Sequence, residues 1–186
     1  SQFEHIGELI VADANEEKAK AVVSQHLENS KTQMRAQFVD VTDSHQLHSF
    51  ISGVTIVLNT VGPFYKFGVD VLTAAIASGC HYIDICDDWE PTIEMMGLDQ
   101  DAQLNDVLAI IGMGASPGIS NLLACLVCEE LETVEDLFTV WPVDAGERGD
   151  AIEEAVQENK GASGAIIHWM QQISGEIDLI EDGKQV

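Results

Sequence analysis

The sequence predicts an α/β fold in which a parallel sheet is covered by helices on both faces. Three observations support this prediction. Short apolar runs recur every ~20 to ~30 residues, the length of one strand and one crossover helix. The segments between the runs show helical spacing of apolar side chains. Most runs also end in a polar residue, as strands do where they border a ligand site.

The apolar runs define the predicted strands, which in chain order are 9–12, 34–39, 54–58, 81–85, 107–111 and 137–141. Two of the intervening segments are clearly amphipathic. Residues 19–27 and 119–127 place mainly apolar side chains at i, i+3, i+4, i+7 and i+8, which is one face of a helix. Strand and helix therefore alternate, and parallel pairing through crossover helices follows.

Polar residues stand at the carboxyl ends of successive predicted strands. They are Asp13, Asp40, Asn59, Asp84 with Asp87, and Gly114 with Ser116. In an open parallel sheet the ligand lies beyond these ends, so the pattern indicates a nucleotide pocket. Asp and Asn are also common turn formers, which is the plainer interpretation of any single one. Their recurrence at five strand ends favours the pocket.

The start of the chain lacks a phosphate-binding turn. A dinucleotide-binding Rossmann fold opens with a strand and a G-x-G-x-x-G turn, and an acidic residue follows ~20 residues later. Asp13 resembles that acidic residue, so we expect a doubly wound sheet whose first strand and glycine loop are missing from the sequence. The first strand is central in the strand order 3-2-1-4-5-6. Without it, the strands ending at Asp13 and Asn59 would not pair with each other and would lie about 10 Å apart, two inter-strand spacings. The sequence is accordingly interpreted as part of a longer protein.

Composition excludes several classes of protein. A net charge of −24 would repel the phosphates of nucleic acid, so no nucleic-acid partner is expected. The charge fits either adaptation to high salt or attraction of cationic substrates, and composition does not separate the two. The sequence has no run of about 18 apolar residues and no secretory leader, which predicts a cytoplasmic protein without a membrane partner.

The four cysteines indicate reduced thiols and not a disulfide framework. Cys125 and Cys128 form a C-x-x-C pattern, but they fall within a predicted helix and no second ligand pair lies nearby in sequence. No metal site is therefore expected.

Three longer motifs narrow the prediction to a family. They are the segments 59–68 (NTVGPFYKFG), 81–89 (HYIDICDDW) and 112–121 (GMGASPGISN). Together they resemble the saccharopine dehydrogenase-like family, of the saccharopine reductase type with a Rossmann domain. The resemblance implies pyridine-nucleotide redox chemistry at a carbon–nitrogen bond, with an amino acid or polyamine-like small molecule as substrate. It also implies an α+β substrate domain and a homodimer for the full-length protein.

The resemblance and the strand-end positions together predict the residues that bind the cofactor, which we expect to be NAD. Asp13 is placed at the adenosine ribose, with Asp40 and Val41 at the adenine edge. The residues expected nearer the phosphates and nicotinamide are Asn59, Thr60, Val61, Gly62, Pro63, Cys86, Gly114 and Ser116. NADP is expected less, because the Asp13 carboxylate would repel a 2′-phosphate and no arginine follows it, although Lys18 and Lys20 are close in sequence.

Two of these motifs also have plain structural interpretations. Gly62-Pro63 after a strand forms a tight turn that lets the backbone approach a cofactor, or it simply joins strand to helix. Ser116-Pro117 suits a helix N-cap followed by proline at the first helical position. By resemblance, that helix start faces the active-site cleft.

Asp87, Trp89 and Arg148 are the predicted catalytic residues. Asp87 follows a strand end beside a second carboxylate, which suits proton exchange with a substrate nitrogen. Trp89 would form a wall of the pocket, and Arg148 would reach a substrate carboxylate from the second domain. A solvated acidic loop and a surface arginine are the alternative interpretations.

The chain is divided into a partial NAD(P)-binding Rossmann domain, residues 1–140, and the beginning of a substrate and dimerisation domain, residues 141–186. Asp182-Gly183 predicts a hairpin near the end. The predicted function is an NAD(P)-dependent oxidoreductase acting at a carbon–nitrogen bond. Two alternatives stay open: a non-catalytic nucleotide-binding regulatory or scaffold module, and a reductase of a non-amine substrate.

Overall fold

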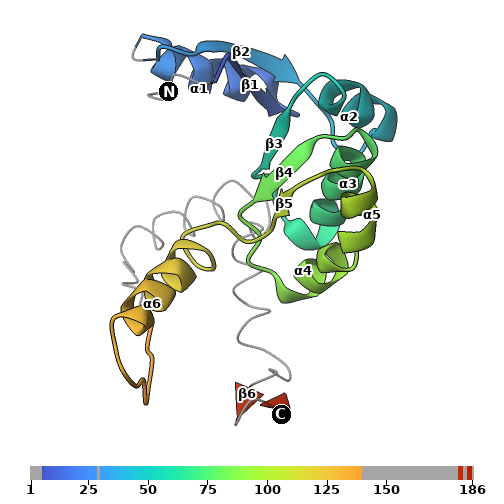
Figure 1. Cartoon of the computed structure of the whole chain (residues 1–186). Coiled ribbons are helices and arrows are strands. Elements are labelled where there is room, and N and C mark those ends of the chain that lie inside the picture. The colour runs from blue at the N-terminus through green and yellow to red at the C-terminus, as the bar shows by residue number, and fades with distance from the viewer. Residues whose placement is uncertain (1–5, 29, 140–179, 182–183, 186) are drawn as a thin grey trace, which may run out of the picture.

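The computed structural model describes residues 6–28, 30–139, 180–181 and 184–185, and strands alternate with helices through most of that part (Figure 1). The strands are β1 (Glu8–Asp13), β2 (Gln33–Phe38), β3 (Ile56–Asn59), β4 (His81–Asp84), β5 (Ala109–Ile110), β6 (Ile180–Glu181) and β7 (Lys184–Gln185). The helices are α1 (Glu16–Leu27), α2 (Ser44–Ile51), α3 (Phe64–Ala77), α4 (Trp89–Met96), α5 (Asp99–Leu104) and α6 (Ile119–Glu129).

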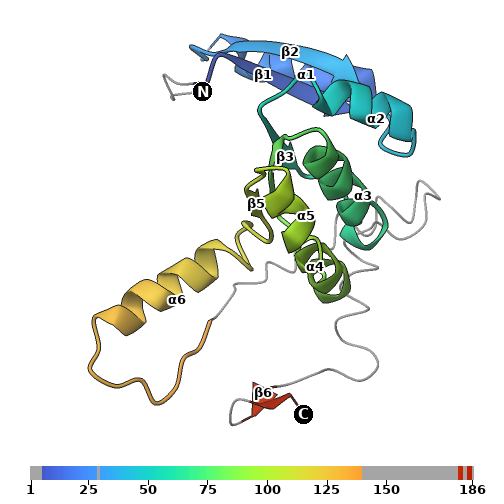
Figure 2. The same ribbon diagram turned by 45° about the vertical axis from the view of Figure 1, so that its right-hand side comes forward.

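The first five strands form two separate parallel sheets. β1 pairs with β2, from Glu8 opposite Gln33 to Asp13 opposite Phe38. In the second sheet β4 lies between β3 and β5. β1 and β3 do not pair with each other, as expected if the first strand of the complete Rossmann sheet belongs between them. The β1–β2 pair lies apart from β4 and β5 in both views (Figure 1 and Figure 2). Parallel strands joined by helices confirm the predicted α/β, Rossmann-like fold class.

Helices cover one face of the β3–β4–β5 sheet. α3 packs against β3 and β4, and it also contacts α2 and α4 (Figure 2). The buried side chains that form this core include Leu47, Ile51, Phe64, Val71, Leu72, Ile76, Tyr82 and Met95. α1 packs on β1 and β2. The core therefore lies between α3 and the strands whose carboxyl ends were predicted to border a ligand.

The opposite face of β3 carries exposed apolar side chains. Ile56 and Leu58 are 58% and 63% exposed, whereas Asn59 is 2% exposed. Side chains alternate between the two faces of a strand, so the same short strand is buried on one side and open on the other. The predicted cover on both faces is thus observed on one face in the described part of the chain.

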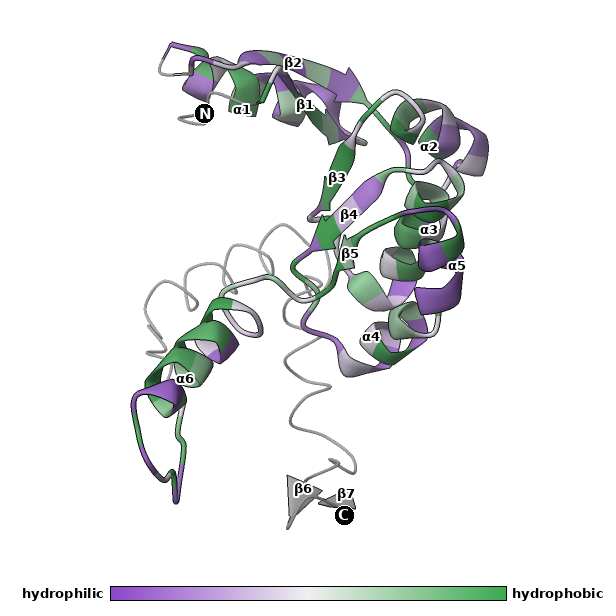
Figure 3. Ribbon diagram, viewed as in Figure 1, coloured by the Kyte–Doolittle hydropathy of each residue, from purple (hydrophilic) through white to green (hydrophobic). Residues whose placement is uncertain are grey.

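α6 is an apolar helix with an exposed surface. None of its residues is buried, and Ile119, Leu122 and Leu126 are 56%, 53% and 59% exposed. In Figure 3 this helix is largely green and extends away from the two sheets. The periodicity of residues 119–127 therefore predicted the helix correctly, but it did not indicate what the helix packs against.

Several other predictions differ from the structure in extent. The strand predicted at 107–111 is reduced to the two residues of β5, and residues 137–139 of the predicted sixth strand are not in a strand. β6 and β7 pair antiparallel, which confirms the hairpin predicted around Asp182-Gly183. The rest of the predicted second domain, with its boundary, lies outside the described residues. In the part of the chain that the structure describes, no helix is both long and apolar enough to cross a membrane.

Leu72→Ala should lower the free energy of unfolding by about 2–5 kcal/mol, because truncation of this fully buried side chain leaves a cavity in the core around α3. Leu104→Ala is the matched control, since Leu104 on α5 is 84% exposed, and it should cost less than ~0.5 kcal/mol. Chemical denaturation followed by circular dichroism measures both values. Equal effects would contradict the assigned core.

Candidate functional site

A chain of buried hydrogen bonds connects the carboxyl ends of β3 and β4. Asn59 Nδ2 donates to the Tyr82 hydroxyl at 2.9 Å, and this hydroxyl donates to Asp84 Oδ2 at 2.8 Å. The three residues are 2%, 1% and 0% exposed. Strand register explains the contact, because Asn59 lies opposite Asp84 and Tyr82 shares a face with Asp84 two residues earlier. We name Asn59, Tyr82 and Asp84 the strand-end cluster.

Asp84 extends the strand-end cluster to two loops. Its Oδ1 accepts hydrogen bonds from the N–H groups of Cys86 at 3.0 Å and Gly112 at 2.7 Å. Its main-chain oxygen accepts a further bond from the Met113 N–H at 2.8 Å. The backbone after β4 and the backbone after β5 are therefore held by the same residue.

Donor and acceptor chemistry sets the direction of the hydrogen bonds in the cluster, since the Asn59 NH2 group can only donate and the Asp84 carboxylate can only accept. Burial raises the pKa of Tyr82 above the usual range, and the neighbouring Asp84 carboxylate raises this pKa further. The hydroxyl consequently keeps its proton, which it donates to Asp84 while it accepts from Asn59. Burial likewise raises the pKa of the Cys86 thiol, which is 0% exposed. Because the whole residue is buried and its N–H donates to Asp84, the predicted contact of Cys86 with a cofactor stays a prediction.

The segment after β3 presents open backbone. Asn59 Oδ1 accepts a hydrogen bond from the Val61 N–H at 2.9 Å, which shapes the turn. A Cβ placed on Gly62 would meet no atom within 4 Å apart from its neighbours in the chain. Thr60 is exposed, and Pro63 directly precedes α3. This turn has the free side that a closely approaching ligand needs.

The segment after β5 forms a tight turn in which the backbone of Gly118 lies against that of Gly114. Gly118 has a φ of 112°, and a Cβ there would lie 2.5 Å from the Gly114 carbonyl oxygen, so only glycine fits. The predicted N-cap role of Ser116 is wrong, because this glycine turn delays the start of α6 to Ile119. Ser116 Oγ instead accepts a hydrogen bond from Ser120 Oγ at 3.2 Å.

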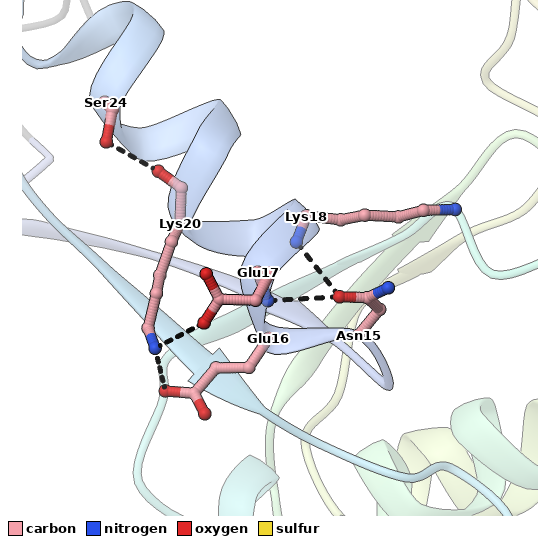
Figure 4. Close-up of polar contacts among 6 residues, drawn as sticks. All are labelled: Asn15, Glu16, Glu17, Lys18, Lys20 and Ser24. Carbon is pink, nitrogen blue, oxygen red and sulfur yellow. Dashed lines mark hydrogen bonds and ion pairs between the residues drawn. The ribbon is translucent and has the colours of Figure 1, made fainter.

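The turn from β1 into α1 is held by Asn15. Its Oδ1 accepts hydrogen bonds from the N–H groups of Glu17 at 3.1 Å and Lys18 at 3.2 Å, which caps the helix (Figure 4). The Asn15 N–H donates to Asp13 Oδ1 at 2.7 Å. The exposed Asp13 carboxylate is therefore held in place at the end of β1, where the adenosine ribose was predicted.

The charged residues of α1 pair with one another. Lys20 Nζ lies 3.2 Å from Glu16 Oε1 and 2.9 Å from Glu17 Oε1, while Lys18 extends away from this group (Figure 4). The hydrogen bonds with Glu17 and Glu16 raise the pKa of Lys20. The charge of Lys20, a residue close to Asp13 in sequence, is therefore already offset by two carboxylates.

Asp40 shapes the loop after β2. Its Oδ1 accepts hydrogen bonds from the Thr42 hydroxyl at 2.7 Å and the Thr42 N–H at 2.9 Å, and both lower the pKa of Asp40. Val41 packs against the hydrophobic core. Both residues thus follow β2 as predicted, and any adenine contact by Val41 would involve only the part of it outside the core.

The acidic loop lies directly after β4. Asp87 is exposed, Asp88 is 8% exposed at the N-cap of α4, and Trp89 on the first turn is 57% exposed. The strand-end cluster holds the N–H of Cys86, the residue before Asp87. Arg148 lies outside the described residues, so its approach to this loop stays a prediction.

Sequence reasoning named Asp84 among the polar residues at strand ends but gave it no individual role, and it did not single out Tyr82. It assigned Asn59 to the cofactor, and in the structure the Asn59 amide bonds to Tyr82 and to Val61. A signal was present in the sequence: two polar groups spaced two residues apart in an apolar strand share one face. When that face is buried, both groups need partners, and a polar residue at the end of the neighbouring strand can supply one.

Comparison with known proteins bears on the family and the fold of the chain. Residues 1–110 match the family described as saccharopine dehydrogenase NADP binding domain. Among solved structures, the chain is similar to the apo, histidine-tagged saccharopine dehydrogenase (L-Glu forming) from Saccharomyces cerevisiae. The identity is 20% and the TM-score 0.56, over 69% of this chain and 26% of that chain. The chain thus spans about a quarter of the length of the yeast enzyme, and the likeness supports the fold.

A metagenomic short-chain oxidoreductase in complex with NADP is more distantly similar. Its identity is 13% and its TM-score 0.42, over 74% of this chain and 86% of that chain.

Gly62→Val should weaken binding of NADH or NADPH by about tenfold or more, because the new side chain occupies the open side of the turn without meeting the protein. Gly53→Val is the matched control, since a Cβ there would be 3.7 Å from the Phe50 carbonyl oxygen and Gly53 precedes β3. Titration followed by nicotinamide fluorescence gives the affinities, and thermal melting checks the fold. Unchanged affinity in Gly62→Val would remove this turn from the site.

Proposed function

Because the chain belongs to the saccharopine dehydrogenase family through its NADP-binding domain, we propose that it binds a pyridine dinucleotide across the strand ends as part of an oxidoreductase. The proposed reaction is hydride transfer at a carbon–nitrogen bond of an amino acid or polyamine-like substrate. The strand-end cluster carries the proposal, because it holds the loops that follow three parallel strands while Gly62 borders open space. Doubly wound sheets bind nucleotides in the crevice beyond such strand ends.

The exposed residues beyond β4 suit the proton step of this reaction. A bound nicotinamide ring supplies the hydride acceptor or donor. In the oxidative direction the substrate carbon loses a hydride, the carbon–nitrogen single bond becomes a double bond, and the nitrogen gives up a proton. We assign that proton to the carboxylate of Asp87. Trp89 would exclude water from one side, and Arg148 would bind a substrate carboxylate through its forked guanidinium.

We propose NAD as the nucleotide, although the description of the family names NADP. The Asp13 carboxylate, held by the Asn15 N–H, is placed to accept hydrogen bonds from the ribose hydroxyls. A 2′-phosphate at the same position would meet the Asp13 carboxylate, and Lys20 on α1 is already paired with Glu16 and Glu17.

The protein should bind NADH more tightly than NADPH, and Asp13→Ser should reduce this preference by about tenfold, because it removes both the ribose hydrogen bonds and the repulsion of a 2′-phosphate. Asp70→Ser on α3 removes an exposed carboxylate elsewhere and serves as the control. Parallel titrations with both reduced nucleotides measure the preference. Tighter binding of NADPH by the wild-type protein would overturn the assignment of NAD.

Asp87→Asn should lower turnover by roughly 10²–10⁴-fold, as removal of a general acid–base group does, while the affinity for the dinucleotide stays nearly constant. Asp101→Asn on α5, which also removes an exposed carboxylate, should leave turnover unchanged. The assay follows NADH formation by absorbance with saccharopine, lysine and polyamine-like amines as substrates. Wild-type protein that binds the dinucleotide but turns over none of these would favour a nucleotide-binding regulatory module or a non-amine substrate.

A further inference from the structure

We propose that Tyr82 and Asp84 are positioning residues for the nicotinamide half of the cofactor. Through the strand-end cluster they hold the loops after β3, β4 and β5 in one arrangement, while the adenosine half depends on β1 and β2. This inference rests on the proposed function. It assigns Tyr82 and Asp84 a specific role in cofactor binding, although these buried side chains touch neither cofactor nor substrate.

The strand-end cluster acts on three loops at once. Asn59 holds one backbone N–H after β3, and Asp84 holds one after β4 and one after β5. Each held N–H lies within two residues of a proposed site residue. The pairs are Val61 with Gly62, Cys86 with Asp87, and Gly112 with Gly114. A shift of any one member of the cluster is therefore transmitted to the backbone that borders the ring.

The hydrogen bonds of the cluster leave few alternatives for its members. The Asp84 carboxylate accepts from Tyr82 and from two backbone N–H groups, and the Tyr82 hydroxyl is both donor and acceptor. Removal of this one hydroxyl would leave Asn59 Nδ2 and Asp84 Oδ2 without a hydrogen-bond partner in a site that is almost fully buried. Because unsatisfied buried groups are costly, the loops are expected to move until new partners are found.

The adenosine half is proposed on a different sheet. Asp13 and Asp40 follow β1 and β2, which pair with each other and not with β3, β4 or β5. The hydrogen bonds of the strand-end cluster run only among β3, β4 and the loops after β3, β4 and β5. A loosened cluster should accordingly disturb the nicotinamide end of the cofactor and leave the adenosine end in place.

The test compares a whole dinucleotide with its adenosine half. Tyr82→Phe should weaken binding of NADH by about tenfold, and binding of ADP, which lacks the nicotinamide riboside, by less than about twofold. The fluorescence enhancement of bound NADH should also fall, because the ring is held less firmly. Asn59→Ala, which cuts the cluster at its other end, should give the same pattern and provides the comparison should Tyr82→Phe not fold. If the wild-type protein binds only NADPH, that nucleotide replaces NADH throughout.

Two controls separate positioning from general loss of stability. Tyr65→Phe removes the hydroxyl of the other tyrosine, which is 47% exposed, and should change neither affinity. Ile51→Val loosens the core at α2, where Ile51 is 1% exposed, and should lower thermal stability with no preference between the two ligands.

Equal weakening of NADH and ADP in Tyr82→Phe, or no change in NADH binding, would overturn the positioning role while the proposed function stands. Wild-type protein that binds neither NADH nor NADPH would overturn the proposed function, and this inference with it.

Discussion

The carboxylate of Asp84 is the group on which the arrangement of the strand ends depends. It is 0% exposed and accepts hydrogen bonds from the Tyr82 hydroxyl and from the N–H groups of Cys86 and Gly112. A buried carboxylate tolerates this environment only when its acceptor sites are filled, so the two loops and the tyrosine satisfy it jointly. The same bonds thus stabilise the fold and set the geometry of the candidate site.

The two sheets divide the candidate site into two parts of different character. At the end of β1, exposed Asp13 precedes α1, whose first-turn carboxylates Glu16 and Glu17 both pair with Lys20. This end suits uncharged ribose hydroxyls. At the ends of β3 and β4 the polar groups are buried and serve the backbone, leaving Asp87 and Trp89 exposed beyond them. The division matches a ligand with one end recognised by polar contact and the other positioned for chemistry.

Ion pairs offset part of the negative charge of the chain on α1 and between β1 and β2. Arg35 Nε lies 2.9 Å from Glu8 Oε1, and Lys20 pairs with two glutamates of its own helix, and all of these side chains are exposed to solvent. Exposed pairs of this kind contribute little to stability, because water and salt screen them. They relieve repulsion along β1 and α1 without altering the negative sign of the net charge.

Periodicity and residue chemistry alone determined the alternation of strands and helices, because alternating and helical spacing are local properties of the chain. They placed β1 to β4 within two residues, and they singled out Asp13, Asp87 and the Gly62 turn by their positions after strands. Register decided the rest. Only the pairing of β3 with β4 brings Asn59 opposite Asp84 and within hydrogen-bond distance of Tyr82, so the Asn59 amide has a partner inside the protein and its predicted contact with the cofactor stays a prediction. The late start of α6 follows from the close approach of Gly118 to Gly114, and the exposure of Ile56 and Leu58 follows from which face of β3 the helices cover, and neither is visible in the periodicity of the sequence.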